Sequence, residues 1–308
     1  MKWIAALTIV LALVTCAGPS AGFLPTTTAE RIGQPVGVAE GSDGALIVLH
    51  RGFTKNADGF IAEDVIAFVD PRNGTILNSW GAGRFRTTHG LHVDPTGNVW
   101  ITDIGSHQVF RFTPAGAPLL TLGRADDPGT APGQFDQPTD VAVTDDGTIF
   151  VTDGYGNRRV VKFTAAGEYV TDWGREGSDP GEFLNPHAIT ISENGQLIVS
   201  DRDNHRIQRF TQDGRLVAIH TTPAPVYATL PLTDSTFLFT DYLTRDTVII
   251  GSEVTRIDGE TTPVLTRPSL NAASPCRYHD LLVKDGYVYL PDLLSKKVHR
   301  YPLPTTRR

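Results

Sequence analysis

The chain has 308 residues, of which 40% are hydrophobic, and a formal net charge of −7. This length and composition suffice for a large folded core. Nucleic-acid binding relies on clustered Lys and Arg, but here the basic residues are dispersed along polar strand faces. The charge and its distribution therefore argue against nucleic acid as a partner.

The first residues have the pattern of an export signal. An apolar run starts at Trp3, directly after Lys2, and reaches Val14, which is too short to span a bilayer. We expect a signal peptide over residues 1–22. A lipoprotein signal ending at Thr15, with lipid on Cys16, is the alternative, although Thr before the Cys fits that pattern poorly. Either case predicts a secreted or extracytoplasmic protein, and no later stretch is apolar enough to span a membrane.

Most of the remaining chain repeats one pattern of short strands. The clearest copy, residues 140–174, reads as four strands separated by three turns, and the first copy carries an insertion at Phe53–Glu63. A single four-stranded sheet of this size is marginal alone, so the copies must pack on one another. The six copies span roughly residues 37–81, 90–123, 140–174, 188–220, 225–259 and 280–303.

Six such units, with a period of about 50 residues, predict an all-β fold: one six-bladed β-propeller over residues 23–308. Stacking into a solenoid is the structural alternative. Closure into a ring is favoured because the last copy keeps three strands, and Phe23–Arg31 could supply a fourth. We expect a monomer.

Histidine recurs at one position of the repeat. Just before the first strand stand Val36, His89, Thr139, His187, a residue near Tyr227, and His279. With 9 His in 308 residues, three at one position by chance is on the order of one in a thousand. Alternate blades of a six-fold ring are related by a three-fold axis, so the three imidazoles would converge at the channel mouth.

Three histidines that converge would suit zinc, because a His₃ set leaves its fourth coordination position open. One His at a strand start is more often a hydrogen-bonded turn residue, and the shared register is what favours a metal. The other six histidines share no such register and are interpreted as structural or solvated. They are His50, His92, His107, His205, His220 and His299.

A second register follows the second strand of each unit, where aspartate is usual and is expected to cap a turn. Beside it stand Arg51, Tyr155 and Arg202. In an antiparallel blade the start of strand one and the end of strand two lie at the same end. These three residues should therefore share one face with the histidines. A zinc with an open position, two arginines and a tyrosine together predict a site for an anionic, hydroxyl-bearing substrate, since Arg binds carboxylates through paired hydrogen bonds.

Taken together, the motifs resemble those of the peptidyl-α-hydroxyglycine α-amidating lyases, which are propellers of NHL repeats. The resemblance runs through nearly all of residues 37–301 and is weakest in the fifth unit. The motifs that carry it are His50-Arg51-Gly52, His89-Gly90-Leu91, Gln137-Pro138-Thr139-Asp140-Val141-Ala142-Val143, Asp153-Gly154-Tyr155, Asn185-Pro186-His187, Asp201-Arg202 and His279-Asp280.

The resemblance implies a reaction and a set of roles. A peptide ending in α-hydroxyglycine would be cleaved to a peptide amide and glyoxylate, with Tyr155 as the base and Arg51 and Arg202 serving the active site. A separate hydroxylating monooxygenase would make this small peptide or N-acyl substrate. The implied metals are catalytic zinc (Zn²⁺) on His89, His187 and His279, and structural calcium (Ca²⁺) on the Asp280 carboxylate and the carbonyls of Val38 and Leu91.

Two other functions stay open at this point. One is a non-catalytic NHL propeller that binds a peptide or a glycan, and the other is a calcium-dependent, lactonase-like propeller. The lactonase reading fits less well, because such enzymes hold their metal with carboxylates and amides where this chain offers imidazoles. Metal content separates the lyase from the binding module, since the latter needs no three-histidine site.

Overall fold

The computed structural model describes residues 32–232, 237–241, 243–245, 248–251, 254–257, 261–265 and 277–302, with side chains up to 241 and again from 277. The expected signal peptide and the expected N-terminal strand at Phe23–Arg31 lie outside these residues. Among the described residues, no helix is long and apolar enough to cross a membrane.

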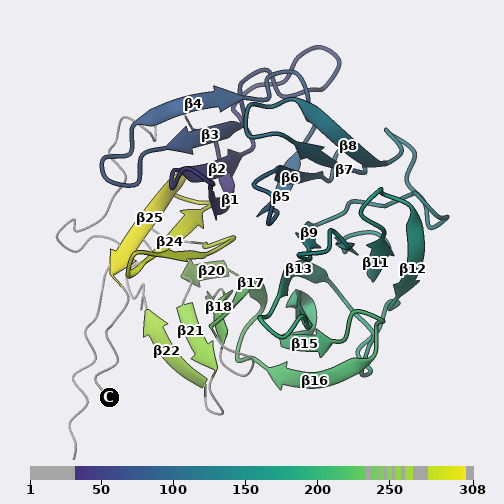
Figure 1. Cartoon of the computed structure of the whole chain (residues 1–308). Coiled ribbons are helices and arrows are strands. Elements are labelled where there is room, and N and C mark those ends of the chain that lie inside the picture. Colours follow the sequence, from purple (N-terminus) through teal and green to yellow (C-terminus); the bar gives the residue numbers. More distant parts are fainter. Residues whose placement is uncertain are drawn as a thin grey trace, which may run out of the picture.

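Six antiparallel sheets form a ring around a central channel, with their first strands innermost (Figure 1). Blades 1 to 3 have four strands each. Blade 1 contains β1 (Pro35–Glu40), β2 (Leu46–His50), β3 (Ile66–Val69) and β4 (Ile76–Trp80). Blade 2 contains β5 (Thr88–Val93), β6 (Val99–Asp103), β7 (Gln108–Phe112) and β8 (Pro118–Gly123). Blade 3 contains β9 (Asp140–Val143), β10 (Ile149–Asp153), β11 (Arg159–Phe163) and β12 (Tyr169–Trp173).

Blades 4 to 6 complete the ring. Blade 4 contains β13 (Pro186–Ile191), β14 (Leu197–Asp201), β15 (Arg206–Phe210) and β16 (Leu216–Thr221), with a short 3₁₀ turn η1 (Arg202–Asn204) after β14. Blade 5 contains β17 (Val226–Pro231), β18 (Phe237–Asp241), β21 (Val254–Ile257) and β22 (Thr261–Leu265). Blade 6 has three described strands, which are β23 (Leu282–Lys284), β24 (Tyr287–Asp292) and β25 (Lys297–Pro302).

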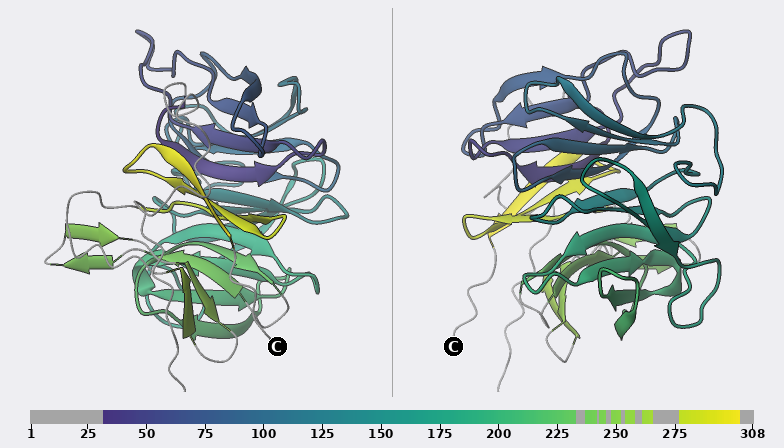
Figure 2. Two further views of the ribbon diagram at one scale, coloured as in Figure 1. Left: turned by 90° about the vertical axis from the view of Figure 1, so that its left-hand side faces the viewer. Right: turned by 45° about the vertical axis from the view of Figure 1, so that its right-hand side comes forward.

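The weak fifth repeat has a structural cause. A separate two-stranded sheet, β19 (Leu243–Arg245) and β20 (Val248–Gly251), is inserted between the second and third strands of blade 5. This hairpin projects from the ring (Figure 2). The insertion displaces the third strand from its usual spacing, which is why the sequence pattern is hardest to follow there.

Buried apolar side chains form one cluster at each of the six junctions between neighbouring blades. Blades 4 and 5 meet through Ile198, Ile207, Val226 and Phe237, for example. The junction that decides closure is that of blades 6 and 1, where Val38, Leu46, Tyr289 and Val298 pack together. Burying each such side chain contributes about 1.5–3 kcal/mol, so this junction stabilises the closed ring. The predicted β-propeller is confirmed, and the solenoid alternative is wrong.

Candidate active site

Backbone pairing between the first and second strands brings the histidine register and the aspartate register to the same end of a blade. In blades 1, 2, 4 and 5 the last residue of the second strand pairs with the first residue of the first strand, as in Thr88 with Asp103 and Pro186 with Asp201. In four blades the register then shifts by a bulge, which turns the next side chain out of the sheet. His89 and His187 occupy two of these bulges. In blade 5 the position belongs to Tyr227, which the sequence placed only approximately.

The three histidines converge in the channel, as their register predicted. Their ring centroids are 4.8 Å apart for His89 and His187, 4.6 Å for His89 and His279, and 4.8 Å for His187 and His279. One ring nitrogen from each lies within 4.8 Å of the others. All three side chains are buried.

Carbonyl groups of the intervening blades fix the imidazoles. The Nδ1 atoms of His89, His187 and His279 lie 2.7, 2.8 and 2.7 Å from backbone carbonyl oxygens. A carbonyl can only accept, so each Nδ1 carries the hydrogen and each Nε2 keeps its lone pair. The three acceptors occupy the same repeat position in the three blades without histidine: Thr139, Tyr227 and Val36.

Glycine at position 90 allows one of these contacts. A Cβ there would lie 2.6 Å from the Thr139 carbonyl oxygen, the acceptor for His89. Any larger residue would push blade 3 away from blade 2 and break this hydrogen bond. The motif His89-Gly90 is therefore explained by close approach of two blades at the site.

Burial keeps the imidazoles neutral. It lowers the pKa of His89 from 6.5 to about 3, and it lowers the pKa values of His187 and His279 well below the usual range; nearby Arg202 acts in the same direction on all three. The Nε2 of His187 is buried and has no hydrogen-bond partner. A lone pair buried in this way is costly unless something binds it. The donor set fits a metal with one open position, and zinc in particular suits three neutral imidazoles.

Tyr155 lies at the rim of the histidine cluster. Its hydroxyl is 2.8 Å from Nε2 of His89, to which it donates, and 3.5 Å from Nη1 of Arg202. Arg51 acts electrostatically on the same hydroxyl, and its guanidinium is held by the Thr88 carbonyl at 3.2 Å and the Gln34 side chain at 3.1 Å. The structure thus brings together all six residues that the sequence proposed for zinc and catalysis. Their roles stay predictions.

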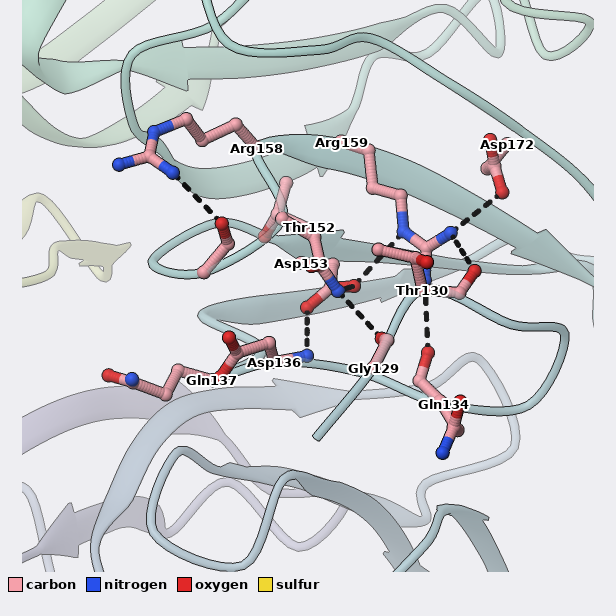
Figure 3. Close-up of polar contacts among 12 residues, drawn as sticks. Gly129, Thr130, Gln134, Asp136, Gln137, Thr152, Asp153, Arg158, Arg159 and Asp172 are labelled. Carbon is pink, nitrogen blue, oxygen red and sulfur yellow. Dashed lines mark hydrogen bonds and ion pairs between the residues drawn. The ribbon is translucent and has the colours of Figure 1, made fainter. Parts of the chain in front are cut away.

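A buried network supports the turn that carries Tyr155 (Figure 3). Asp153 accepts from the backbone N–H of Asp136 at 2.8 Å and from Nε of Arg159 at 3.0 Å. Arg159 also donates to the carbonyls of Thr130 and Gln134. The predicted capping role of aspartate at this register matches these contacts. The network fixes the corner of blade 3, and Gly154 lets it pack on blade 4, since a Cβ there would meet the Pro186 carbonyl at 2.2 Å.

His50 replaces aspartate at this register in blade 1. Its Nδ1 accepts from the backbone N–H groups of Gly33 at 3.2 Å and Gly52 at 3.1 Å. Burial lowers its pKa to about 4, so the ring stays neutral and can accept. Asp201 makes the corresponding contacts in blade 4, from Leu184 and Asn185. His50 therefore has a structural part, as its departure from the metal register suggested.

Sequence reasoning missed Arg277 and the role of Tyr227. The guanidinium carbons of Arg202 and Arg277 lie 5.3 and 4.9 Å from the ring centre of Tyr227. Tyr227 itself packs edge-on against His187, with centroids 4.9 Å apart. Arg277 stands two residues before His279, and therefore outside both sequence registers. Its fixed spacing from the histidine register is the sequence signal that points to it.

The layer below the histidines contains two aspartates on opposite blades. Asp140 and Asp280 each follow the histidine register and each accept from the neighbouring blade, from Ile189 and Val38 respectively, both at 2.9 Å. Burial raises the pKa of Asp280 to about 7, and burial with the charge of Asp280 raises that of Asp140 well above its usual value. The sequence analysis proposed Asp280 as a calcium ligand and assigned no such role to its counterpart Asp140.

These carboxylates line the channel together with the other predicted calcium ligands. A cavity of about 30 Å³ lies between the histidine and aspartate layers, and one of about 220 Å³ opens below it. Leu91 lines both cavities and Val38 lines the larger one. Two carboxylates whose ionisation is disfavoured by burial would gain from a cation between them. Oxygen donors of this kind fit calcium.

The fold and the site together define a β-propeller with a three-histidine centre at one mouth of its channel. Residues 134–255 match a family described as 6-bladed beta-propeller. A solved structure of a streptogramin B lyase covers 92% of this chain and 96% of that one, with a TM-score of 0.60. At 16% identity this likeness supports the fold alone.

Relatives with curated names are closer in sequence. The chain is 42% identical over 203 residues to the rat peptidylglycine alpha-amidating monooxygenase, covering 59% of this chain and 21% of the relative. It is 46% identical over 120 residues to peptidyl-alpha-hydroxyglycine alpha-amidating lyase 1 of Drosophila melanogaster, covering 38% and 22%. The chain therefore spans about a fifth of the length of these relatives. The predicted resemblance to the amidating lyases is confirmed.

Proposed function

We propose that the protein is a zinc-dependent carbon–nitrogen lyase that cleaves a peptidyl-α-hydroxyglycine, or a related α-hydroxy amide, to an amide and glyoxylate. The observation that carries this proposal is the position of the Tyr155 hydroxyl, 2.8 Å from Nε2 of one histidine in a converging set of three. This contact supports Tyr155 as the proton acceptor, because zinc on Nε2 of His89 would take the lone pair that the hydroxyl meets and would leave the phenol oxygen beside the metal position. The names of the relatives support the same reaction.

Each group of the site has a part in this reaction. His89, His187 and His279 would hold zinc, which would supply Lewis acidity to the substrate α-hydroxyl. Tyr155, as the phenolate, would take the proton of that hydroxyl. As the hydroxyl carbon becomes a carbonyl, its bond to nitrogen breaks, and the nitrogen takes up the proton that Tyr155 removed and leaves as the amide. No oxidant or reductant is needed.

The arginines have two different tasks in this proposal. Arg51 is fixed by Gln34 and the Thr88 carbonyl and acts on Tyr155, so it stabilises negative charge on the phenol oxygen. Arg202 is partly buried and paired with Asp203 at 2.8 Å, and it keeps donors for the carboxylate of the substrate. Calcium between Asp140, Asp280 and the nearby carbonyls would have a structural part, because it would tie opposite blades together.

The test is direct. Zinc-loaded protein is incubated with N-benzoyl-α-hydroxyglycine, and the release of both benzamide and glyoxylate is followed. Equal amounts of the two products, formed well above the uncatalysed rate, are expected. If neither product exceeds that rate, the lyase proposal is wrong and a propeller that binds ligands without catalysis takes its place.

The proposal extends to where the protein acts and to the enzyme that supplies its substrate. The export signal expected at residues 1–22 would place the protein outside the cytoplasm, with Cys16 as a lipid attachment point in the alternative case. A separate monooxygenase would supply the hydroxylated substrate.

A further inference from the structure

Arg202 is held by the carboxylate of the next residue in the chain. Its Nε donates to Oδ1 of Asp203 at 2.8 Å, and its Nη2 donates to Oδ2 at 3.3 Å. These two nitrogens form one side of the guanidinium, so both carboxylate oxygens engage it in a paired contact. The Arg202 side chain is only 14% exposed. The pair therefore fixes the plane of a guanidinium that is largely shielded from water.

Asn185 holds the same carboxylate from blade 4. Its Nδ2 donates to Oδ2 of Asp203 at 3.1 Å, while its backbone carbonyl accepts from the backbone N–H of Arg202 at 2.9 Å. Because a carboxylate can only accept, the amide nitrogen must face Asp203. The amide oxygen of Asn185 is then buried without a hydrogen-bond partner among the described residues, which is unfavourable for stability. The amide is thus placed for its contact with Asp203 and not for its own satisfaction.

The remaining donors of Arg202 face the site. Its Nη1 lies 3.5 Å from the hydroxyl oxygen of Tyr155, and its guanidinium carbon lies 5.6 Å from the centre of the Tyr155 ring. Asp203 occupies the side formed by Nε and Nη2, so the hydrogens at the Nη1–Nη2 end are those left for an anion beside Tyr155. The contact with Asp203 therefore decides which edge of the guanidinium a substrate meets.

Blade 1 offers a comparison, because it carries the other arginine of the site, Arg51. There the next residue is Gly52, and Gln34 holds the guanidinium directly through its side-chain oxygen at 3.1 Å. Gln34 and Asn185 stand at the same repeat position, two residues before the histidine register. Both blades thus use this position to hold an arginine. Only blade 4 places a carboxylate between the amide and the guanidinium.

We propose that Asp203, held by Asn185, is a positioning residue that fixes Arg202 with its Nη1–Nη2 end toward the substrate carboxylate. This inference deepens the proposed lyase function and rests on it for the identity of the substrate. Burial alone would raise the pKa of Asp203, but the hydrogen bonds and charge of Arg202 lower it overall, so Asp203 is ionised at neutral pH.

Positioning and charge predict opposite effects of Asp203. A guanidinium that is already fixed need not be ordered when the substrate binds, which favours binding. The negative charge of Asp203, taken alone, would repel the substrate carboxylate and weaken binding. Removing that charge should therefore raise KM if Asp203 positions Arg202, and should lower KM if Asp203 acts only through its charge.

The experiment is a double-mutant cycle. Wild type, Asp203→Asn, Arg202→Gln and the double variant, all zinc-loaded, are assayed for benzamide release from N-benzoyl-α-hydroxyglycine. Asparagine keeps the shape of the side chain but accepts at one atom only, so one bond to the guanidinium is lost. Ordering a long side chain on binding lowers affinity about two- to tenfold, so Asp203→Asn should raise KM by that factor while kcat stays within about twofold of wild type.

The cycle also tests the route of the effect. A positioning residue acts only through the group that it holds, so Asp203→Asn should add nothing in the Arg202→Gln background. Asn185→Ala should raise KM in the wild-type background and add nothing to Asp203→Asn, for the same reason. A KM of Asp203→Asn that equals or falls below that of wild type, or an equal rise with and without Arg202, would overturn the inference.

Asp70→Asn is the matched control. Asp70 accepts from Nε of Arg72 at 3.0 Å and from Nη2 at 2.7 Å, which is the same kind of pair, but it follows β3 at the end of blade 1 away from the histidines. This variant should match wild type in KM and kcat. Tm and zinc content, measured on all samples, show that the variants compared are folded and loaded.

Binding of glycolate, measured by calorimetry, needs no turnover. Asp203→Asn should weaken glycolate binding about two- to tenfold, and only where Arg202 is present. This dependence in a protein without turnover would sink the lyase proposal and leave the positioning role standing. Turnover with independent, additive effects of Asp203→Asn and Arg202→Gln would do the reverse. A wild type that neither turns over nor binds glycolate would remove both.

Discussion

The substitution Tyr155→Phe tests the centre of the proposed mechanism with little change in structure. The ring packs edge-on against His89 at 5.2 Å and His187 at 6.0 Å, and lies under Arg202 at 5.6 Å. Phenylalanine keeps all of these contacts. In the metal-free protein the hydroxyl contributes the hydrogen bond to His89, so its removal there should cost about 1 kcal/mol of folding free energy.

The expected loss of activity is far larger. Removal of a general base typically slows the reaction about 100- to 10,000-fold, which raises the barrier by about 3–5 kcal/mol. Because Tyr155 acts only as the proton leaves, the loss should fall on kcat, whereas Arg202→Gln should act mainly on KM. The assay follows benzamide and glyoxylate release at saturating substrate, with zinc content and Tm measured on the same samples. A kcat within about tenfold of wild type, with zinc retained, would refute Tyr155 as the base.

Three further outcomes follow from the geometry. His187→Ala should lose tightly bound zinc, whereas the matched control His220→Ala, on the outer strand β16, should keep it. Elemental analysis measures the zinc content of both variants, and unchanged zinc in His187→Ala would contradict the three-histidine centre. Asp280→Asn should abolish the rise in Tm that calcium gives to wild type, and an equal rise in both proteins would remove calcium from the channel. The free energy of unfolding of the metal-free protein should fall as pH falls from 6.5 toward 3, because the unfolded chain protonates imidazoles such as His89 that the folded state keeps neutral. Urea titrations at pH 7.5 and pH 5 measure this loss. A smaller loss is expected in His187→Ala, which has one buried imidazole fewer.

The repeat pattern was sufficient to predict the fold and most of the mouth. Aligning the repeats by their first turn placed His89, His187 and His279 in one register, and the ring then brought their side chains together. Arg51, Tyr155 and Arg202 followed from a second register, because antiparallel pairing puts both at the same end of a blade. These predictions needed only local periodicity and the symmetry of a closed ring.

Other features of the site depend on contacts between blades, which no single repeat contains. Arg277 was missed because its importance lies in its approach to Tyr227 and Arg202 from a different blade. The role of Asp140 was missed for a similar reason, since its carboxylate matters through Asp280 on the opposite side of the channel. Both stood at definable repeat positions, but the sequence gives those positions no meaning until the ring is closed.

By itself, then, the sequence determined which residues repeat, in which register, and at which end of each blade they fall, because strand and turn periodicity are local properties of the chain. The tertiary structure decided the chemistry of those residues. The carbonyls of Thr139, Tyr227 and Val36 fix the imidazole tautomers, and burial keeps the rings neutral. Both effects arise between blades, where groups far apart in sequence exclude water from one another, and so only the closed ring supplies them.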